Sequence, residues 1–307
     1  MKSCPPILLM LLAGSFLFGG ESLSEDNRVH LDPAVQNLIF ADITSDDSGG
    51  LIALEEETGR LHFFSPEGKL IRHLDWLSED MAAVASLKDL LWVDGQLWVS
   101  NFMDHSITRL KDDKVVGRIK PGKKSFYLSR MGDKVLVWQS PLPGIFRVYH
   151  SDGTVQKQFD VAIPNPNDRL GTGFEKLWAG IAAAPMPDGR VFVGFTFDNK
   201  TAVVDTNGKV SDLKSMDDAY TYNLRGGVPF FFSASDFEVS PKGAIWLAAA
   251  TVADRDCNRV LAYDLVGKKT SPVHIIDGHI KKIRFLNKGA LVAFVNGDGK
   301  TLLYKLP

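Results

Sequence analysis

Short apolar runs recur along the whole chain, and each begins just after a turn residue. The runs have four or five residues and either alternate apolar with polar positions or are apolar throughout. Strands with these lengths and patterns, bounded by Gly and Asp, are typical of antiparallel β-sheets joined by tight turns. Six such turn residues occur at intervals of 38 to 56 positions: Gly50, Gly95, Asp133, Gly189, Gly243 and Gly289.

The surroundings of these six phrases are also alike. A strand-like run precedes each phrase, a second one follows it, and a Gly- or Asp-containing turn then leads to a shorter fourth run in the units that have room for it. No run of 12 or more residues combines helical periodicity with helix caps. Four antiparallel strands per unit, repeated at about 40–50 residues, predict an all-β fold, a six-bladed β-propeller.

The two ends of the chain are predicted to complete the ring. The sixth unit runs out after its third strand, and residues 28–31, ahead of the first unit, are available as its fourth strand. We therefore expect residues 28–31 to pair with residues 301–305, so that the propeller is closed by pairing of its N- and C-terminal segments. Such pairing removes an exposed sheet edge.

Two tryptophans occupy similar places in their units. Trp98 and Trp246 both fall early in the second strand of a blade. The prediction is that both are buried between neighbouring blades.

Three phrases resemble the repeats of six-bladed propellers of the NHL-repeat and TolB-like kind. They are residues 94–99 (Asp-Gly-Gln-Leu-Trp-Val), residues 187–193 (Pro-Asp-Gly-Arg-Val-Phe-Val) and residues 240–247 (Ser-Pro-Lys-Gly-Ala-Ile-Trp-Leu). The resemblance extends over nearly all of residues 28–307 and implies the architecture. It implies no particular function, because propellers serve as enzymes, receptors and scaffolds.

The N-terminal residues have the features of a targeting signal. Lys2 precedes an uncharged apolar run that is shorter than a comfortable membrane span, and small residues follow it at sites suited to cleavage after Ser22 or Ser24. We predict a signal peptide over residues 1–24 and a propeller domain over residues 25–307, exported to the periplasm or the extracellular space. An uncleaved N-terminal anchor is the alternative. No later segment is long and apolar enough to span a membrane.

The composition and the charge balance argue against two classes of protein. Apolar residues make up 45% of the chain, and 35 Lys and Arg are balanced by 37 Asp and Glu, a net charge of −2. This balance argues against a disordered chain. It also argues against a nucleic-acid partner, because nucleic-acid-binding proteins usually carry a basic excess.

The long connections of the predicted propeller all fall on one face, where the inner strands begin. Two of them, residues 160–178 and 215–235, are rich in Arg, carboxylate and aromatic side chains, which suit a protein, peptide or glycan ligand. An alternative is that Tyr220, Tyr222 and residues 230–232 only plug the channel mouth. Five residues are predicted to line one ligand-binding depression there: Arg169, Trp178, Tyr222, Arg225 and Asp236.

Catalytic motifs are missing from the sequence. The seven histidines show no zinc-binding spacing, and there is no Gly-x-Ser-x-Gly nucleophile elbow or Rossmann fingerprint in the predicted mature chain. The leading interpretation is an exported, non-catalytic propeller without a cofactor. The alternative is a metal-dependent hydrolase or lyase, similar to lactonase and strictosidine-synthase-like propellers, with a divalent metal such as calcium at the channel mouth. Glu175 and Asp236 would then supply oxygen ligands.

Overall fold

The computed structural model describes most of the chain after its first 19 residues. The described residues are 20–82, 86–122, 126–139, 144–162, 181–195, 200–211, 214–215, 223–225, 228–230, 234–249, 258–264, 268–270, 273–276, 278–286, 291–297 and 300–306. Over these ranges the regular secondary structure is almost entirely β-strand, as predicted. The exceptions are two 3₁₀ turns, η1 (Glu25–Asn27) and η2 (Pro33–Val35), and the short helix α1 (Glu79–Ala82).

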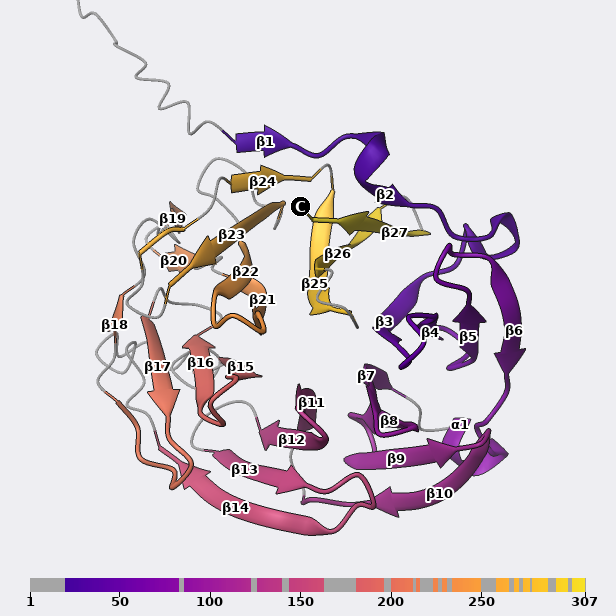
Figure 1. Ribbon diagram of the computed structural model, residues 1–307, viewed down its shortest axis with the longest axis horizontal. Helices are drawn as coiled ribbons and strands as arrows, with labels where there is room; N and C mark the ends of the chain where they lie inside the picture. Colours follow the sequence, from indigo (N-terminus) through magenta and orange to yellow (C-terminus); the bar gives the residue numbers. More distant parts are fainter. Residues whose placement is uncertain are drawn as a thin grey trace, which may run out of the picture.

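Six four-stranded antiparallel blades surround a central axis, each with its first strand innermost, which confirms the six-bladed β-propeller (Figure 1). The first three blades follow the chain in simple order. Blade one is β3 (Phe40–Ser45), β4 (Leu51–Glu55), β5 (Leu61–Phe64) and β6 (Leu70–Leu74); blade two is β7 (Leu87–Val93), β8 (Gln96–Asn101), β9 (Ser106–Lys111) and β10 (Lys114–Ile119); blade three is β11 (Phe126–Met131), β12 (Lys134–Gln139), β13 (Gly144–Tyr149) and β14 (Val155–Val161).

Blades four and five also follow the chain, whereas blade six takes its fourth strand from the N-terminal segment. Blade four is β15 (Ile181–Pro185), β16 (Val191–Phe195), β17 (Lys200–Val204) and β18 (Lys214–Ser215); blade five is β21 (Ala234–Val239), β22 (Ile245–Ala249), β23 (Arg259–Tyr263) and β24 (Val273–Ile275); blade six is β25 (His279–Phe285), β26 (Leu291–Gly297), β27 (Lys300–Lys305) and β2 (Arg28–Val29). Between blades four and five, β19 (Asn223–Arg225) and β20 (Val228–Phe230) form a separate antiparallel hairpin.

The predicted ring closure is confirmed. Arg28 pairs with Tyr304 and Val29 with Leu303, although the strand is shorter than the predicted residues 28–31. A second tie joins blade six to blade one, because the backbone N–H of Phe40 donates to Oγ1 of Thr301 at 2.9 Å. The sheet edge of β27 is therefore covered by the N-terminal segment.

A further strand comes from within the predicted signal peptide. β1 (Gly20–Ser22) runs parallel to β24, with Gly20 opposite Val273 and Ser22 opposite Ile275, and adds a fifth strand to blade five (Figure 1). Removal of residues 1–24 would leave blade five with its own four strands. The cleavage itself stays a prediction. No helix in the described part of the chain is long and apolar enough to cross a membrane.

Apolar side chains fill the spaces between blades. Trp98 is fully buried where blades two and three meet, with its ring 6.0 Å from that of Tyr149. Trp246 is only half-buried, and its indole stacks on His274 at 6.3 Å. The prediction of burial is therefore confirmed for Trp98, but Trp246 is less buried than predicted. At the equivalent place in its blade, Trp246 contacts an imidazole and stays partly exposed to solvent.

The two faces of the ring differ in their connections. The inner strands end at short turns on what we call the short-turn face, formed by residues 46–50, 94–95, 132–133, 186–190 and 240–244. One of these turns needs a positive φ at both central positions, and Asp94 (φ 50°) and Gly95 (φ 72°) supply it. The opposite face, where the inner strands begin, carries the longer connections and is called the long-loop face.

Candidate functional site

Charged side chains from the inner strands meet in the centre of the ring. Four of the six blades contribute, and the group is called the channel cluster. Its carboxylates come from blades one, two and five, and both of its cations come from blade six. The members are Asp42 on β3, Asp89 on β7, Asp236 and Glu238 on β21, and Lys282 and Arg284 on β25.

Arg284 joins blades one, five and six. Its Nη1 lies 2.6 Å from Oδ2 of Asp236 and 3.4 Å from Oε1 of Glu238. On its other side, Nε lies 3.2 Å from Oδ1 of Asp42. The planar guanidinium can serve several carboxylates at once because its five N–H donors diverge in a fixed fork.

Lys282 completes the group toward blade two. Its Nζ lies 2.6 Å from Oδ1 of Asp89 and 3.0 Å from Oδ2 of Asp42, and it also donates to the backbone oxygen of Lys88 at 2.5 Å. Asp42, with 1% of its surface exposed, therefore lies between the two cations. Buried charges paired in this way avoid most of the cost of desolvation, which an unpaired charge would bear in full.

The three aspartates of the channel cluster each accept a backbone hydrogen bond from a neighbouring blade. The N–H of Leu90 donates to Oδ2 of Asp42 at 2.9 Å, and the N–H of Leu128 donates to Oδ2 of Asp89 at 3.1 Å. In the same way, the N–H of Ile283 donates to Oδ2 of Asp236 at 3.0 Å. Each aspartate thus binds the inner strand of the next blade. The strand register shifts beside each of them, a bulge that turns the side chain toward the neighbour.

The channel cluster shifts the pKa values of its members in opposite directions. Burial acts to raise the pKa of Asp42, but Arg284, Lys282 and the N–H of Leu90 outweigh burial and lower it. Burial raises the pKa of Asp236, and Arg284 offsets this only in part. Burial also raises the pKa of Glu238 to about 8, with Asp236 and Asp42 adding repulsion. Burial would lower the pKa of Arg284, yet the surrounding carboxylates raise it well above its usual range.

The channel cluster does not fit a resident calcium ion. Its carboxylate oxygens are the donors that calcium prefers. However, Nζ of Lys282 and the guanidinium of Arg284 lie 2.6–3.4 Å from those oxygens, so two cations already occupy the space among them. Among the described residues, no three side chains of His, Cys, Asp or Glu are arranged to hold a metal ion.

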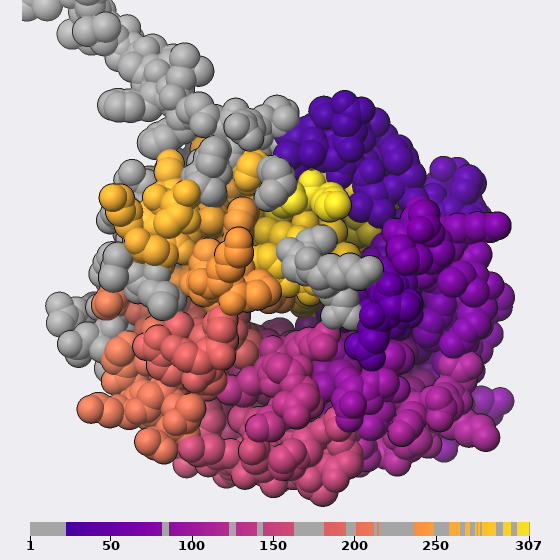
Figure 2. Space-filling view, viewed as in Figure 1, coloured from indigo at the N-terminus to yellow at the C-terminus, as the bar shows by residue number. Residues whose placement is uncertain are grey.

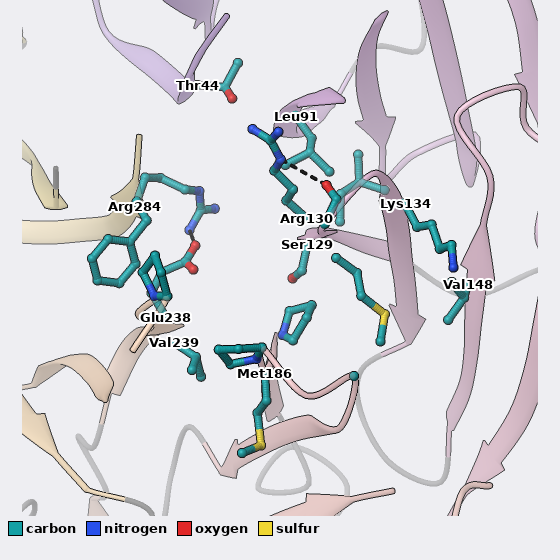
Figure 3. A pocket seen from close by; sticks show the side chains of 18 of the residues that line it. Thr44, Leu91, Ser129, Arg130, Lys134, Val148, Met186, Glu238, Val239 and Arg284 are labelled. Atoms are coloured by element: carbon teal, nitrogen blue, oxygen red, sulfur yellow. Dashed lines mark hydrogen bonds and ion pairs between the residues drawn. The ribbon is translucent and has the colours of Figure 1, made fainter. Parts of the chain in front are cut away.

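A cavity of about 910 Å³ lies beside the channel cluster, toward the short-turn face. All six blades contribute to its wall, and the blades leave an opening at the centre of the ring (Figure 2). Glu238 and Arg284 point toward each other at one side of it, while Arg130 and Lys134 of blade three point away from each other (Figure 3). The cavity therefore has Glu238 and Arg284 of the channel cluster at one side and basic groups of blade three at another.

The predicted binding residues are placed only in part. Asp236 lies in the channel, bound to Arg284, and Arg225 ends β19, with its side chain outside the description. Arg169, Trp178 and Tyr222, together with Glu175 of the metal alternative, lie outside the described residues. Whether the five predicted residues share one depression thus stays a prediction.

The sequence did contain a signal for the rest of the channel cluster. Asp42, Asp89 and Asp236 each stand third in an inner strand and are followed by an apolar residue. A charged residue at the same place in three repeats is unusual for a strand buried on both sides. Residues 281–284, in the sixth repeat, include basic side chains. These are the natural partners of the three carboxylates.

Comparisons with known proteins agree on the fold. No protein-family model matches the chain, and no curated protein sequence matches it. Among solved structures, virginiamycin B lyase from Staphylococcus aureus, an inactive variant with quinupristin, superposes with a TM-score of 0.58 at 10% identity, covering 90% of this chain and 87% of that one. The calcium-binding protein regucalcin from Agrobacterium tumefaciens gives 0.57 at 14% identity, covering 92% and 94%. The WD40 propeller domain of Doa1 gives 0.55 at 14% identity, covering 87% and 78%.

Proposed function

We propose that this protein is an exported, non-catalytic β-propeller that binds a protein, peptide or glycan on its long-loop face. The proposal assigns the ring a scaffolding role and the connections between blades a binding role. Loops held on a rigid scaffold are where binding residues commonly lie.

The channel cluster is the observation that supports this proposal most. A propeller hydrolase that used a metal would need its channel carboxylates for the ion. Here Asp42, Asp89 and Asp236 are bound to Lys282, Arg284 and the backbone of the next blade. These contacts tie blades together, so the cluster has a structural explanation that needs no reaction.

The hairpin of β19 and β20 supports a binding role for the connection between blades four and five. Three residue pairs hold it, with Arg225 opposite Val228. A paired hairpin presents its side chains with less loss of conformational entropy than an unpaired loop of the same length. Arg is also frequent among the residues that dominate binding energy.

A metal-dependent hydrolase or lyase is the second candidate. The observation in its favour is that the same fold is found in a lyase and in a calcium-binding protein, at 10% and 14% identity. Sequence identities this low show only that the folds are alike. The channel carboxylates argue against this candidate, because they are already bound to Lys282 and Arg284.

The binding proposal is tested by probing glycan and peptide arrays with the purified protein. Tyr222→Ala and Arg225→Ala should each weaken binding of the best hit by about 1–3 kcal/mol while leaving the melting temperature unchanged. Arg190→Ala, a change on the short-turn face, is the matched control and should leave binding unchanged. A calcium-dependent turnover of lactones or esters, lost with Asp236→Asn, would instead establish the second candidate.

A further inference from the structure

The outer edge of blade five holds a strand that comes from outside the blade. β1 (Gly20–Ser22) runs parallel to β24 (Val273–Ile275) at the rim of the ring, and three residue pairs join the two strands (Figure 1). Leu23 follows directly and packs against apolar side chains that blades five and six bury together. The edge of β24 therefore accepts an extended segment and has an apolar seat just beyond the paired residues.

The backbone of β24 turns two of its residues toward β1. The N–H of Ile276 donates to the backbone oxygen of Asn258 at 2.9 Å, so it faces β23. Because neighbouring residues of a strand face opposite sides, the N–H and C=O groups of Val273 and Ile275 face outward. In the parallel pair, Glu21 stands opposite the middle residue of β24, and its own N–H and C=O face that strand.

The edge of β24 also differs from the edges of other blades. The outer strands of blades one, two and three each pair with their inner neighbour through a shift of register. Bulges of this kind twist a sheet edge away from further pairing. The residue pairs described for β24 and β23 show no such shift. A regular edge can take another strand.

The strand that covers this edge belongs to the predicted signal peptide. Cleavage after Ser22 or after Ser24 would remove β1 in either case, and cleavage after Ser24 would also remove Leu23. Val273 and Ile275 would then present unpaired backbone groups at the rim of the exported protein. An unpaired sheet edge is a template for pairing with another chain.

We propose that export frees the edge of β24, which then binds an extended segment of a partner protein as a parallel fifth strand. The partner's backbone would replace that of β1, and an apolar side chain would take the place of Leu23. Strand addition of this kind takes its affinity from main-chain hydrogen bonds and its selectivity from side-chain seats. The inference rests on the export proposed above, but the surface lies on the outer rim and is separate from the long-loop face.

The probe is a fluorescein-labelled peptide with the sequence of residues 18–24, Phe-Gly-Gly-Glu-Ser-Leu-Ser. Mass spectrometry first gives the N-terminus of the exported protein, which should be Leu23 or Glu25. Fluorescence anisotropy should then show saturable binding of the peptide to this protein. The full chain, purified without export and with residues 20–23 in place, should bind it at least about tenfold more weakly, because its own strand occupies the edge at a high effective concentration.

Two methylated peptides separate strand addition from general adsorption. A methyl group on the amide nitrogen of Glu21 removes a donor that faces β24. It should raise the Kd about tenfold, the size expected when a backbone hydrogen bond is lost and its acceptor is left unpaired. The same group on the nitrogen of Ser22 is the matched control, since that nitrogen faces away from β24, and it should leave the Kd unchanged.

Tyr222→Ala and Arg225→Ala on the long-loop face should not change peptide binding, so a failure of this proposal is distinct from a failure of the binding function proposed above. Three results would each overturn the proposal. They are no saturable binding to the exported protein or equal binding to the full chain, equal Kd values for the two methylated peptides, and an exported protein that still contains residues 20–22.

Discussion

Removal of the Arg284 side chain should be one of the most damaging single changes in the ring. Arg284→Met keeps the length and apolar stem of the side chain but removes its charge and donors. Asp42, Asp236 and Glu238 would then share only Lys282, which reaches Asp42 at 3.0 Å. Loss of one partner from a buried ion pair costs about 3–5 kcal/mol, because the remaining charge stays buried without compensation. That is a large part of the 5–15 kcal/mol that stabilises a typical domain.

The loss should depend on pH in a defined direction. In the wild type the pKa of Asp42 is lowered, so its contribution is present above its unfolded pKa of 3.8 and is lost as pH falls through the folded value. Arg284→Met removes a cation that lowers the pKa of Asp42, while burial still acts to raise it. The penalty of the buried carboxyls should therefore grow as pH rises and be relieved when they gain protons. The difference between the two proteins should therefore be larger at about pH 8 than at about pH 5.

Urea unfolding at the two pH values, followed by tryptophan fluorescence, measures this difference. Arg190→Met is the control, since Arg190 pairs with Asp188 at an exposed position and should change stability by no more than about 1 kcal/mol. If Arg284→Met lost no more than the control, or lost the same amount at both pH values, the assignment of the cluster as a buried ion-pair tie would be refuted.

The tryptophan packing, the ring closure and the burial of Glu238 can each be tested on the purified protein. Trp98→Ala should cost about 3–5 kcal/mol, since the ring is fully buried, while Trp246→Ala should cost clearly less because its ring is half-buried; equal losses in urea unfolding would contradict the assigned packing. Deletion of residues 25–35 removes β2 and exposes β27, so the truncated protein should melt at a lower temperature and associate in size-exclusion chromatography; an unchanged, monomeric product would show that closure is dispensable. Glu238→Gln should gain stability relative to the wild type as pH rises from about 5 to 9, because the wild type is penalised for losing the proton of a carboxyl whose pKa is about 8, and a pH-independent difference would count against that value.

The architecture could be predicted because each blade repeats a local pattern. Turn residues such as Gly95 and Gly189 mark the hairpins, and alternation marks the strands, so six similar units required a closed ring. Even the joining of Arg28 to Tyr304 followed from the missing strand in the last unit. The hairpins and strands depend on residues that are close in sequence, and the closure of the ring depends on how many units there are.

The channel cluster depends on contacts of another kind. Arg284 and Asp42 are 242 positions apart and meet only after the ring has closed. Their repeat positions mark them as unusual, but only the closed ring shows that cations of blade six lie among carboxylates of three other blades. Trp246 illustrates the same limit. Its place in the repeat matches that of Trp98, but its ring stacks on His274 of its own blade, whereas the ring of Trp98 lies beside Tyr149 of the next blade.

In this channel Lys282 and Arg284 take the place that a metal ion would have. Elemental analysis of the purified protein, combined with melting curves in calcium and in EDTA, shows whether the protein holds a metal. We expect no stoichiometric divalent ion and the same melting temperature in millimolar calcium and in EDTA. One tightly bound calcium per chain, whose removal by EDTA lowers the melting temperature, would contradict it.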